Sequence, residues 1–410
     1  MNNISKYLVK GIFSKNYNII NKATLSEIKD PKHIINYNIN KDKKVFKIRN
    51  IGVDLLRIVS MYGIIICHTL GHGGGYIKYR KYDKLFLLDA IFNWHIIVFG
   101  IISGIVGYRT YKYSNLLYLW ICVTFYSVII NLYYQKYKPL SVINDKLYSE
   151  FFPVIYNKYW YFTKYFGMYL FLSLINKGIE YLTKSELKIL VMSLYGVIII
   201  WRYSKNKILD AFSINNGNSI IWFIILYITG GYIGKYNLIY NGIRKVILCL
   251  IYLIIFIFTT IIIYYLPRYN LYNIKSNYIK KIIILIKSFI DRKFDSIPKI
   301  IQSISITLFL IQIKYNKYLA KIISFFGPLT FGIYLIHDNK LVRKNKIRKM
   351  YNSLPNNLPL NSVIKYTFIK VSKIFFLCSI FDYIRHRIFI LFKIRKICIF
   401  LEKTAFKILG

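Results

Sequence analysis

The sequence predicts an all-α, polytopic membrane protein with about ten transmembrane helices. The chain has 410 residues, of which 56% are hydrophobic, and its apolar residues gather in long runs between connectors rich in Lys, Asn and Tyr. Many of these runs approach the roughly 20 residues that a helix needs to cross a bilayer. Only helices or closed barrels satisfy every backbone polar group in lipid, and barrel strands would be short and alternating.

The apolar runs define the candidate spans in order. They lie near residues 52–70, 87–108, 115–133, 165–182, 188–201, 219–236, 245–266, 300–316, 319–336 and 363–381. The fifth is short, and the last contains Lys365, Lys370 and Lys373. Residues 280–294 and the tail 383–410 mix basic with apolar residues at helical spacing, which predicts helices lying in the headgroup plane.

The termini differ in composition from the apolar region between them. Residues 1–48 are polar and basic without a signal-peptide pattern, so we expect a disordered or surface-lying arm. The sequence therefore predicts this arm, a membrane domain over 49–382 and a basic amphipathic tail over 383–410. The basic arm favours a cytoplasmic N-terminus, although the connectors 267–299 and 337–362 are also basic and would face outward.

The charge and cysteine patterns exclude several classes of site. The net charge is +43, but the basic residues are scattered between apolar runs, which favours contact with anionic lipid headgroups over nucleic-acid binding. The cysteines stand singly without disulfide or metal-ligand spacing, so we expect neither a disulfide nor a metal site. They are Cys67, Cys122, Cys249, Cys378 and Cys398.

The first predicted span carries ionisable residues on one face. A helix turns about 100° per residue, so Asp54 and Arg57 can pair, and His68 lies on the same side as Arg57, about 16 Å along the axis. Charges inside a membrane normally face a bundle interior or a water-filled cavity. Asp54 and Arg57 are close enough to the span's start to be a snorkelling ion pair. A purely structural role explains His68 less well. It is followed by "GHGGG", and glycines let the backbone approach a ligand closely.

The stretch "NIGVDLLRIVSMYGIIICH" resembles the opening of the acyltransferase 3 family, integral membrane enzymes that O-acetylate polysaccharides and other extracytoplasmic acceptors. The family pattern of Arg or Lys, ten residues and His matches Arg57 and His68. Its second motif, Arg-x-x-Arg after the second span, matches "GYRTYKYS" with Arg109 and Lys112, where Lys replaces the second Arg. The positive charge survives, but the bidentate fork does not.

Three further blocks occur in family order. They are "FNWHIIVFGIISGIVGYRTYKYS" with Ser103-Gly104, "FFPVIYNKYWYFTKYFGMYL" with Trp160-Tyr161, and "FGPLTFGIYLIHDN". Each is a weak pattern alone, and together they are fairly specific. They are most similar to the branch of bacterial polysaccharide O-acetyltransferases.

The resemblance implies acetyl-CoA, or another acyl-CoA, as a donor from the cytosol, a carbohydrate or glycolipid acceptor on the far side of the bilayer, and no permanently bound cofactor. An imidazole suits proton transfer at neutral pH, so His68 would activate the acceptor hydroxyl or transiently carry the acyl group. Arg109 and Lys112 would pair with the phosphates of coenzyme A. Arg57 would hold the pantetheine side or steady charge on the thioester carbonyl.

Other candidates carry competing structural readings. His95 is a proton shuttle or a satisfied core histidine, and His337 lines the cavity or packs in the core. Trp160, with Tyr161, would stack on a sugar ring or belong to an aromatic belt. His72 is an alternative to His68 that lies off the motif spacing. The remaining histidines look like surface residues: His33 and His386.

Two other readings of the whole chain compete with an enzyme. A transporter, flippase or glycan polymerase would also keep ionisable residues in the membrane, but such proteins usually show paired halves, and no internal repeat is visible. An inactive relative would explain Lys112 and the unusual Lys340 after "HDN". Retention of Arg57 and His68 argues against it.

Overall fold

The computed structural model describes residues 49–109, 111–135, 148–203, 213–236, 242–266, 276, 293–348 and 350–409. The chain divides into two units, Met1–Arg49 and Asn50–Gly410, and all the helices named here belong to the second. Within the described ranges every regular element is a helix, so the all-α class is confirmed. The predicted arm, residues 1–48, and residues 280–292 of the predicted interfacial segment lie outside them.

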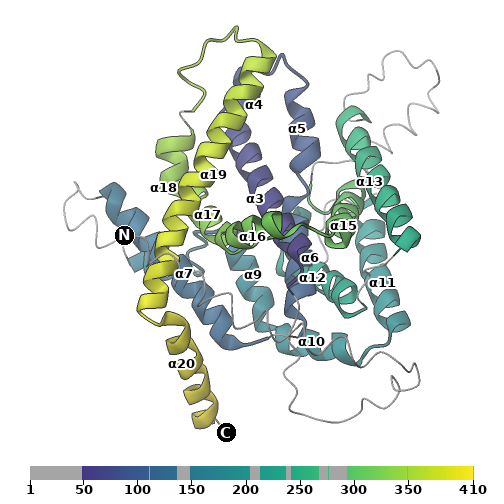
Figure 1. The fold of residues 1–410 in the computed structure, drawn as a ribbon, viewed down its shortest axis with the longest axis vertical. Coiled ribbons are helices and arrows are strands. Elements are labelled where there is room, and N and C mark those ends of the chain that lie inside the picture. Colours follow the sequence, from purple (N-terminus) through teal and green to yellow (C-terminus); the bar gives the residue numbers. More distant parts are fainter. Residues whose placement is uncertain are drawn as a thin grey trace. The chain divides into compact units, whose positions relative to one another are not determined.

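Figure 1 shows the arrangement of the helices. In chain order they are α3 (Ile51–His72), α4 (Gly75–Lys78), α5 (Leu85–Phe92), α6 (His95–Gly107), α7 (Tyr113–Gln135), α9 (Trp160–Leu170), α10 (Leu172–Tyr181), α11 (Lys184–Tyr203), η2 (Asn215–Gly217), α12 (Ile220–Lys235), α13 (Gly242–Tyr265), α15 (Ile297–Gln312), α16 (Lys317–Phe326), η4 (Gly327–Leu329), α17 (Thr330–His337), α18 (Lys340–Val342), the π-helical turn η5 (Arg343–Ile347), α19 (Leu360–Leu391) and α20 (Ile394–Leu409).

Five segments of the described residues are long and apolar enough to cross a membrane, which supports a membrane protein. They are Ile51–His72, Leu85–Gly107, Tyr113–Tyr134, Gly242–Tyr265 and Lys317–His337. The predicted count of ten is not confirmed. The predicted spans 219–236 and 300–316 correspond to α12 and α15, with 16 residues each. The predicted span 165–182 is divided between α9 and α10 at Phe171.

Helix α3 is the element on which the rest of the unit is assembled. Its N-terminus is capped by Asn50, whose side chain accepts a hydrogen bond from Gly52 N at 2.8 Å. The helix contacts α5, α6, α15, α16, α17 and α19. A polar stripe on α3 is therefore enclosed by other helices rather than turned to lipid.

Helices α6 and α12 pack through glycines, and Figure 1 shows them side by side. A Cβ on Gly104 would lie 2.0 Å from Tyr227 O, and one on Gly230 would lie 1.9 Å from Ile101 O. Small residues at such positions let two backbones approach closely, which is the usual way for helices to associate in membranes. The Ser-Gly pair noted in the sequence thus serves helix packing through Gly104.

The second span is broken between α5 and α6, at Asn93 and Trp94. Three carbonyls at the break accept hydrogen bonds from side chains. Ala90 O accepts from Gln302 Nε2 of α15 at 3.0 Å, and Ile91 O accepts from the Trp94 indole. Phe92 O pairs with Nδ1 of His95. The break is therefore satisfied within protein, as irregular backbone at membrane depth must be.

Helix α19 contains a buried ion pair, and one of its members is hydrogen-bonded to α7. Arg385 donates to both carboxylate oxygens of Asp382 at 2.9 Å, and Tyr126 of α7 donates to Asp382 Oδ1 at 2.8 Å. A bidentate arginine–carboxylate pair fixes geometry as well as charge. The helix runs without interruption across residue 382, where the sequence places the end of the membrane domain, and the tail beyond it is helical.

Candidate active site

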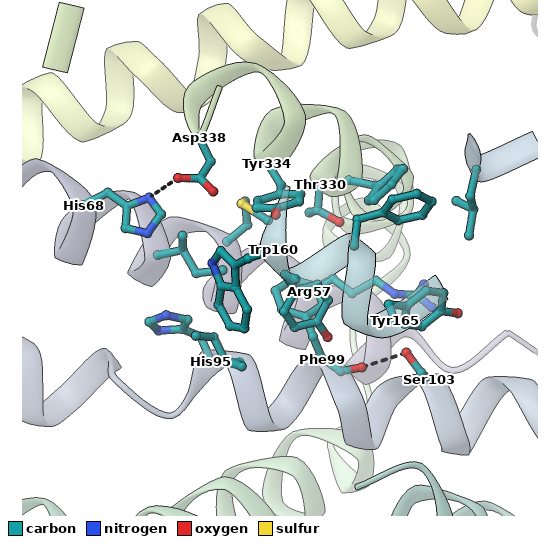
Figure 2. A pocket seen from close by; sticks show the side chains of 17 residues that line it. Arg57, His68, His95, Phe99, Ser103, Trp160, Tyr165, Thr330, Tyr334 and Asp338 are labelled. Atoms are coloured by element: carbon teal, nitrogen blue, oxygen red, sulfur yellow. Dashed lines mark hydrogen bonds and ion pairs between the residues drawn. The ribbon is translucent and has the colours of Figure 1, made fainter. Parts of the chain in front are cut away.

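A cavity of about 200 Å³ opens between α3, α6, α9 and α17, and Figure 2 shows the side chains that line it. Arg57 lies toward one end and His68 toward the other, so the polar stripe of α3 runs along the cavity wall. Aromatic and aliphatic side chains make up most of the remaining lining, with few polar groups. The lining includes Met61, His95, Phe99, Ser103, Trp160, Tyr161, Tyr165, Thr330, Tyr334 and Asp338.

His68 faces the carboxylate of Asp338 across the cavity end. Its Nδ1 lies 3.5 Å from Asp338 Oδ1, and Asp338 is 4% exposed. A carboxylate beside Nδ1 favours the tautomer with the proton on Nδ1, which leaves the lone pair on Nε2. Figure 2 shows the second ring nitrogen turned toward Trp160 and His95, into the cavity. This arrangement suits a general base. The contact between Nδ1 and Asp338 Oδ1 is long for a hydrogen bond, and catalytic contacts often shorten when substrate binds.

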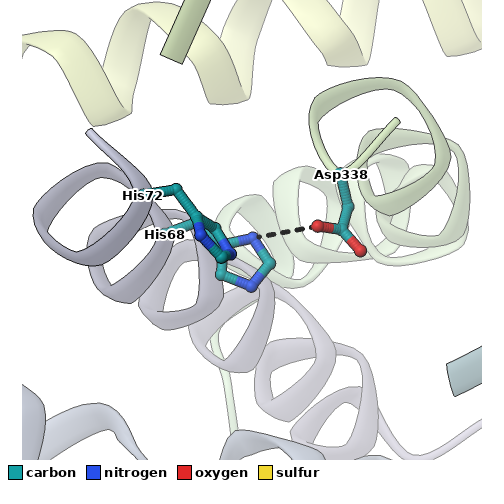
Figure 3. Close-up of side chains that lie close together, drawn as sticks. All are labelled: His68, His72 and Asp338. Carbon is teal, nitrogen blue, oxygen red and sulfur yellow. Dashed lines mark ion pairs between the residues drawn. The ribbon is translucent and has the colours of Figure 1, made fainter. Parts of the chain in front are cut away.

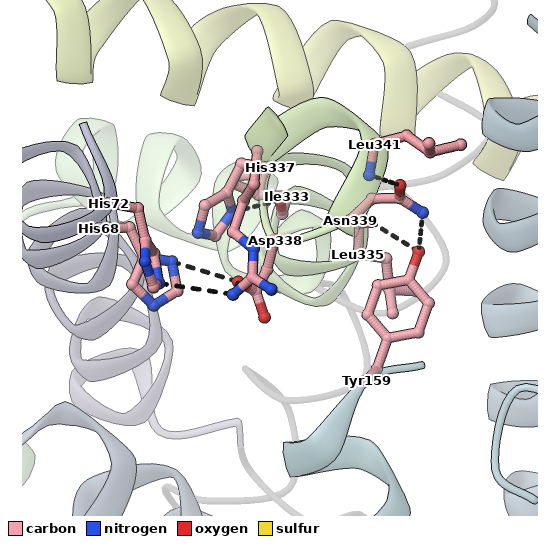
Figure 4. Close-up of polar contacts among 10 residues, drawn as sticks. His68, His72, Tyr159, Ile333, Leu335, His337, Asp338, Asn339 and Leu341 are labelled. Atoms are coloured by element: carbon pink, nitrogen blue, oxygen red, sulfur yellow. Dashed lines mark hydrogen bonds and ion pairs between the residues drawn. The ribbon is translucent and has the colours of Figure 1, made fainter. Parts of the chain in front are cut away.

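Asp338 is positioned by the end of α17 and by the residue after it. Asn339 donates from Nδ2 to the hydroxyl of Tyr159 at 2.8 Å, and that hydroxyl donates to Leu335 O at 3.0 Å. The Asn339 side chain also accepts from Leu341 N at 2.9 Å and so begins the next helix. Figure 4 shows this network beside the His68 cluster. Burial raises the pKa of Asp338 to about 6, although the nearby Arg343 acts in the opposite direction.

His337 is buried and does not line the cavity. Its Nδ1 lies 2.7 Å from Ile333 O, which assigns the proton to Nδ1. Its Nε2 has no hydrogen-bond partner among the described residues, and its ring centroid is 5.3 Å from that of His68. The structure therefore places His337 behind His68 rather than against a ligand.

His68, His72 and Asp338 form a cluster whose donor atoms lie within 4.8 Å of one another, as Figure 3 shows. Such a set has the ligand types of a transition-metal site. However, Arg343 Nη1 lies 3.4 Å from His72 Nε2 and 3.2 Å from Asp338 Oδ1. A metal ion would have to share these ligands with a guanidinium, so we interpret the cluster as an acid–base group.

His95 is a hydrogen-bonded core histidine that also lines the cavity. Its Nδ1 pairs with Phe92 O and helps to satisfy the break between α5 and α6. Its ring, 3% exposed, also forms part of the cavity wall. A replacement at this position would therefore disturb the fold and the cavity together.

Arg57 reaches the cavity while paired with Asp54. The Nη1–Oδ1 distance is 2.8 Å, and Asp54 is 1% exposed and packed against Gly327. Arg57 is 27% exposed, so its charge remains partly accessible. Asp54 does not line the cavity and acts through Arg57, which it orients.

Aromatic residues of α9 and α17 provide the middle of the wall. Trp160, Tyr161 and Tyr334 all line the cavity. The hydroxyls of Tyr161 and Tyr334 are buried and have no hydrogen-bond partner among the described residues. Buried polar groups usually have partners, so these two hydroxyls stand out, although both are enclosed by protein and would have to turn to reach a molecule in the cavity.

Arg109 and Lys112 lie outside the cavity. Both are exposed, in the turn after α6, at the end of the helix opposite to His95. The Arg109 guanidinium lies over the ring of Tyr108, 5.0 Å from its centroid, and Lys112 O accepts from Tyr169 at 2.9 Å. The structure therefore separates these two basic residues from the residues beside His68.

Sequence reasoning missed Asp338, Tyr334 and Arg343. Asp338 and Tyr334 stood inside the quoted "YLIHDN" block, where an acid directly after an apolar span was the available signal. Arg343 stood among many basic residues, and nothing local marked it. Its contacts join residues 271 positions apart, which no periodicity reports.

Comparison with known proteins adds one match. A family model described as an acyltransferase domain matches residues 50–369, a range that contains every residue lining the cavity. No curated protein and no solved structure matches the chain. The match begins at the cap of α3 and ends within α19.

Proposed function

The chain belongs to the acyltransferase 3 family, and we propose that it is a membrane O-acyltransferase that moves an acetyl group from acetyl-CoA to a hydroxyl of a carbohydrate or similar acceptor. The observation that carries this proposal is the placement of His68, backed by Asp338, at one end of a cavity whose other end holds Arg57. A base and a cation at opposite ends of a narrow, mostly apolar cavity suit a long thioester donor.

His68 acts as the general base. Its Nε2 takes the proton from the acceptor hydroxyl, the oxygen attacks the thioester carbonyl, and the C–S bond breaks to release the thiolate of coenzyme A. The proton then passes from His68 to that thiolate. Asp338 is a positioning residue that fixes the tautomer and stabilises the imidazolium. Direct transfer needs no acyl-histidine, and the alternative in which His68 carries the acetyl group uses the same geometry.

The separation along α3 favours one of the two roles expected for Arg57. Eleven residues at about 1.5 Å each place it about 16 Å from His68 along the helix axis. Arg57 is therefore too far from the reacting carbonyl to stabilise it while His68 acts as the base. It contacts the pantetheine arm or the adjoining phosphates instead.

The hydroxyl of Tyr161 or Tyr334 would stabilise the reacting carbonyl after turning into the cavity. Both residues line the cavity and both hydroxyls lack a partner among the described residues. Donors aimed at a developing oxyanion in a dry site commonly contribute the largest share of catalysis.

The donor's nucleotide stays outside the cavity. The mostly apolar lining of the cavity suits the pantetheine end of the donor better than its charged nucleotide. Arg109 and Lys112 lie in the exposed turn after α6, so they bind the phosphates that remain outside. With the N-terminus in the cytoplasm, the donor enters from that side and the acceptor reaches His68 from the other.

The test uses purified protein with radiolabelled acetyl-CoA and a glycan acceptor. We expect His68→Ala to lower acetyl transfer by about 10²-fold or more, the range for loss of a general base. Arg57→Gln and Arg109→Ala should raise KM for acetyl-CoA. His386→Ala, which removes an exposed histidine of α19, is the matched control and should resemble the wild type.

Equal label in the wild type and His68→Ala, with equal amounts of folded protein, would remove the catalytic assignment. It would then favour a polytopic transporter or an inactive relative, the readings that need no acyl chemistry. Labelled free acetate in the wild type without labelled glycan would keep the acyltransferase chemistry and reject the acceptor class.

A further inference from the structure

Arg343 places a positive charge beside the catalytic end of the cavity. Its Nη1 lies 3.2 Å from Asp338 Oδ1 and 3.4 Å from His72 Nε2, and its side chain is 27% exposed. The His72 ring centroid is 5.0 Å from that of His68. Arg343 is thus linked to the proposed base through two neighbours, on the side away from Arg57.

The backbone around Arg343 has an unusual form. Residues Arg343–Ile347 make a π-helical turn, in which Arg348 N donates to Arg343 O at 2.9 Å, five residues earlier. Such turns are rare and occur frequently at functional sites. The buried side chain of Ile347 anchors this turn to the protein, while the adjacent Lys344 and Lys346 are exposed.

The segment that contains Arg343 carries one sign of charge. From Lys340 to Met350 the sequence has several basic residues and no acidic one, and no Asp or Glu occurs again until Asp382. The single described acid beside this segment is Asp338, already engaged with His68 and Arg343. Arg348 also lies within electrostatic range of His72. The local charge around Arg343 is therefore strongly positive.

Arg343 differs from a nearby basic residue, Lys78, whose contacts are with backbone carbonyls and stabilise the fold. Lys78 donates to the carbonyls of Tyr351 and Asn352, and so holds the connector before α19. By contrast, the described residues engage Arg343 through one nitrogen, and a guanidinium has five N–H donors in a planar fork. A guanidinium fork of this kind matches the geometry of a carboxylate or phosphate.

From these contacts we infer that Arg343 selects an anionic acceptor, a hydroxyl-bearing sugar with a carboxylate or phosphate about one ring away from the hydroxyl that is acetylated. The inference rests on the proposed function and names the substrate class of the same site. The anion would pair with Arg343, with Lys344 and Arg348 adding to the local field. This pairing would place the neighbouring hydroxyl against Nε2 of His68.

The test compares matched neutral and anionic acceptors. The protein is placed in nanodiscs of zwitterionic phosphatidylcholine, and release of the coenzyme A thiol is measured with methyl β-glucoside, methyl β-glucuronide and methyl β-glucoside 6-phosphate. We expect kcat/KM to be about tenfold higher for the anionic probes, as for a hydrogen bond to a charged group. Added salt should reduce this ratio.

Arg343→Gln should bring the ratio of anionic to neutral kcat/KM close to one, and Arg343→Lys should keep part of it. A loss common to all probes cancels in this ratio, so damage to the Asp338–His68 contact does not imitate the result. Arg387→Gln, which removes an exposed arginine of α19, should keep the wild-type ratio.

Other outcomes distinguish acceptor selection by Arg343 from acyl transfer itself. Acetylation of the glucoside as efficiently as of the anionic probes would overturn the inference and leave the acyltransferase proposal standing. An Arg343→Gln variant that keeps the wild-type ratio would assign Arg343 to the structural pairing of Asp338. A preference that arises only in nanodiscs with anionic lipid would assign the basic segment to headgroups and overturn acceptor selection. Loss of transfer to every probe in the wild type would overturn both proposals.

Discussion

Gly332 of α17 lies directly against Asp382 of α19, because a Cβ atom on residue 332 would come within 1.8 Å of Asp382 Oδ1. The contact joins the helix that ends at His337 to the buried pair of Asp382 with Arg385. The ion pair therefore helps to fix the position of α17, and with it the position of Asp338, although neither Asp382 nor Arg385 lines the cavity.

Gly332→Ala should lower both stability and transfer. The added methyl group must displace Asp382 or α17, and overpacking of this kind costs about 1–3 kcal/mol. The measurement is the melting temperature in detergent together with kcat. Gly196→Ala, in α11 where a Cβ meets nothing within 4 Å, is the control. A Gly332→Ala variant that melts and turns over like the control would contradict the close contact.

Asp338 should give the activity an acidic limb. Its pKa is raised by burial to about 6, so the carboxylate is ionised above that pH and becomes protonated below it. Protonation removes the charge that stabilises the imidazolium of His68, so kcat/KM should fall as the pH falls through about 6. Infrared difference spectroscopy should show a carboxylic acid band that titrates at this midpoint in the wild type and is missing in Asp338→Asn.

The same shift has an opposite consequence for stability. A carboxyl whose folded pKa is raised from 3.8 to about 6 stabilises the fold most below pH 4, and this contribution is lost as the pH rises through about 6. Asp338→Asn, which resembles the protonated form, should therefore melt at or above the wild-type temperature at pH 8 while lowering kcat about 10²-fold. A parallel fall of both quantities would identify Asp338 as a structural residue instead.

Gly104→Ala should separate α6 from α12. Its Cβ would lie 2.0 Å from Tyr227 O and 2.7 Å from Gly231 N, and backbone atoms cannot move aside as a side chain can. We expect the melting temperature in detergent to fall by several degrees or the protein to be lost on extraction. Gly178→Ala, in α10 with open space at its Cβ, should be neutral or slightly stabilising, because Ala favours a helix.

The sequence predicted the parts of the site that depend on local periodicity. Arg57 and His68 share a face because they belong to one helix, and helical spacing is readable from residue numbers. Asp338 reaches His68, and Arg343 reaches His72, from about 270 positions away along the chain, through the packing of α17 and η5 against α3. No local pattern encodes such a contact, so these partners emerged only with the fold.

The predicted count of ten spans is not confirmed, because hydropathy alone does not decide which apolar helices cross the membrane. Hydropathy reports how apolar a segment is, and a short apolar helix buried in protein looks the same as one facing lipid. Gln302 and Ser303 of α15 show the difference, because both are buried and both donate to backbone carbonyls of the α5–α6 region. Helix α15 thus presents polar side chains to the carbonyls at the α5–α6 break and mostly apolar side chains elsewhere.

The break between α5 and α6 also bears on how the chain is made. Ala90 O receives its hydrogen bond from Gln302, which leaves the ribosome more than two hundred residues later. Until then the Ala90 carbonyl lacks this hydrogen bond while the second span is in the translocation machinery or the bilayer, where an unpaired carbonyl is costly. We expect chains truncated before α15 to be retained by membrane chaperones and degraded, and Gln302→Leu to share that fate in full-length form. A pulse-chase experiment would compare the degradation rates of the Gln302→Leu chain and of Gln312→Leu, a change at the far end of α15. The difference measures how much the stability of the newly made chain depends on Gln302.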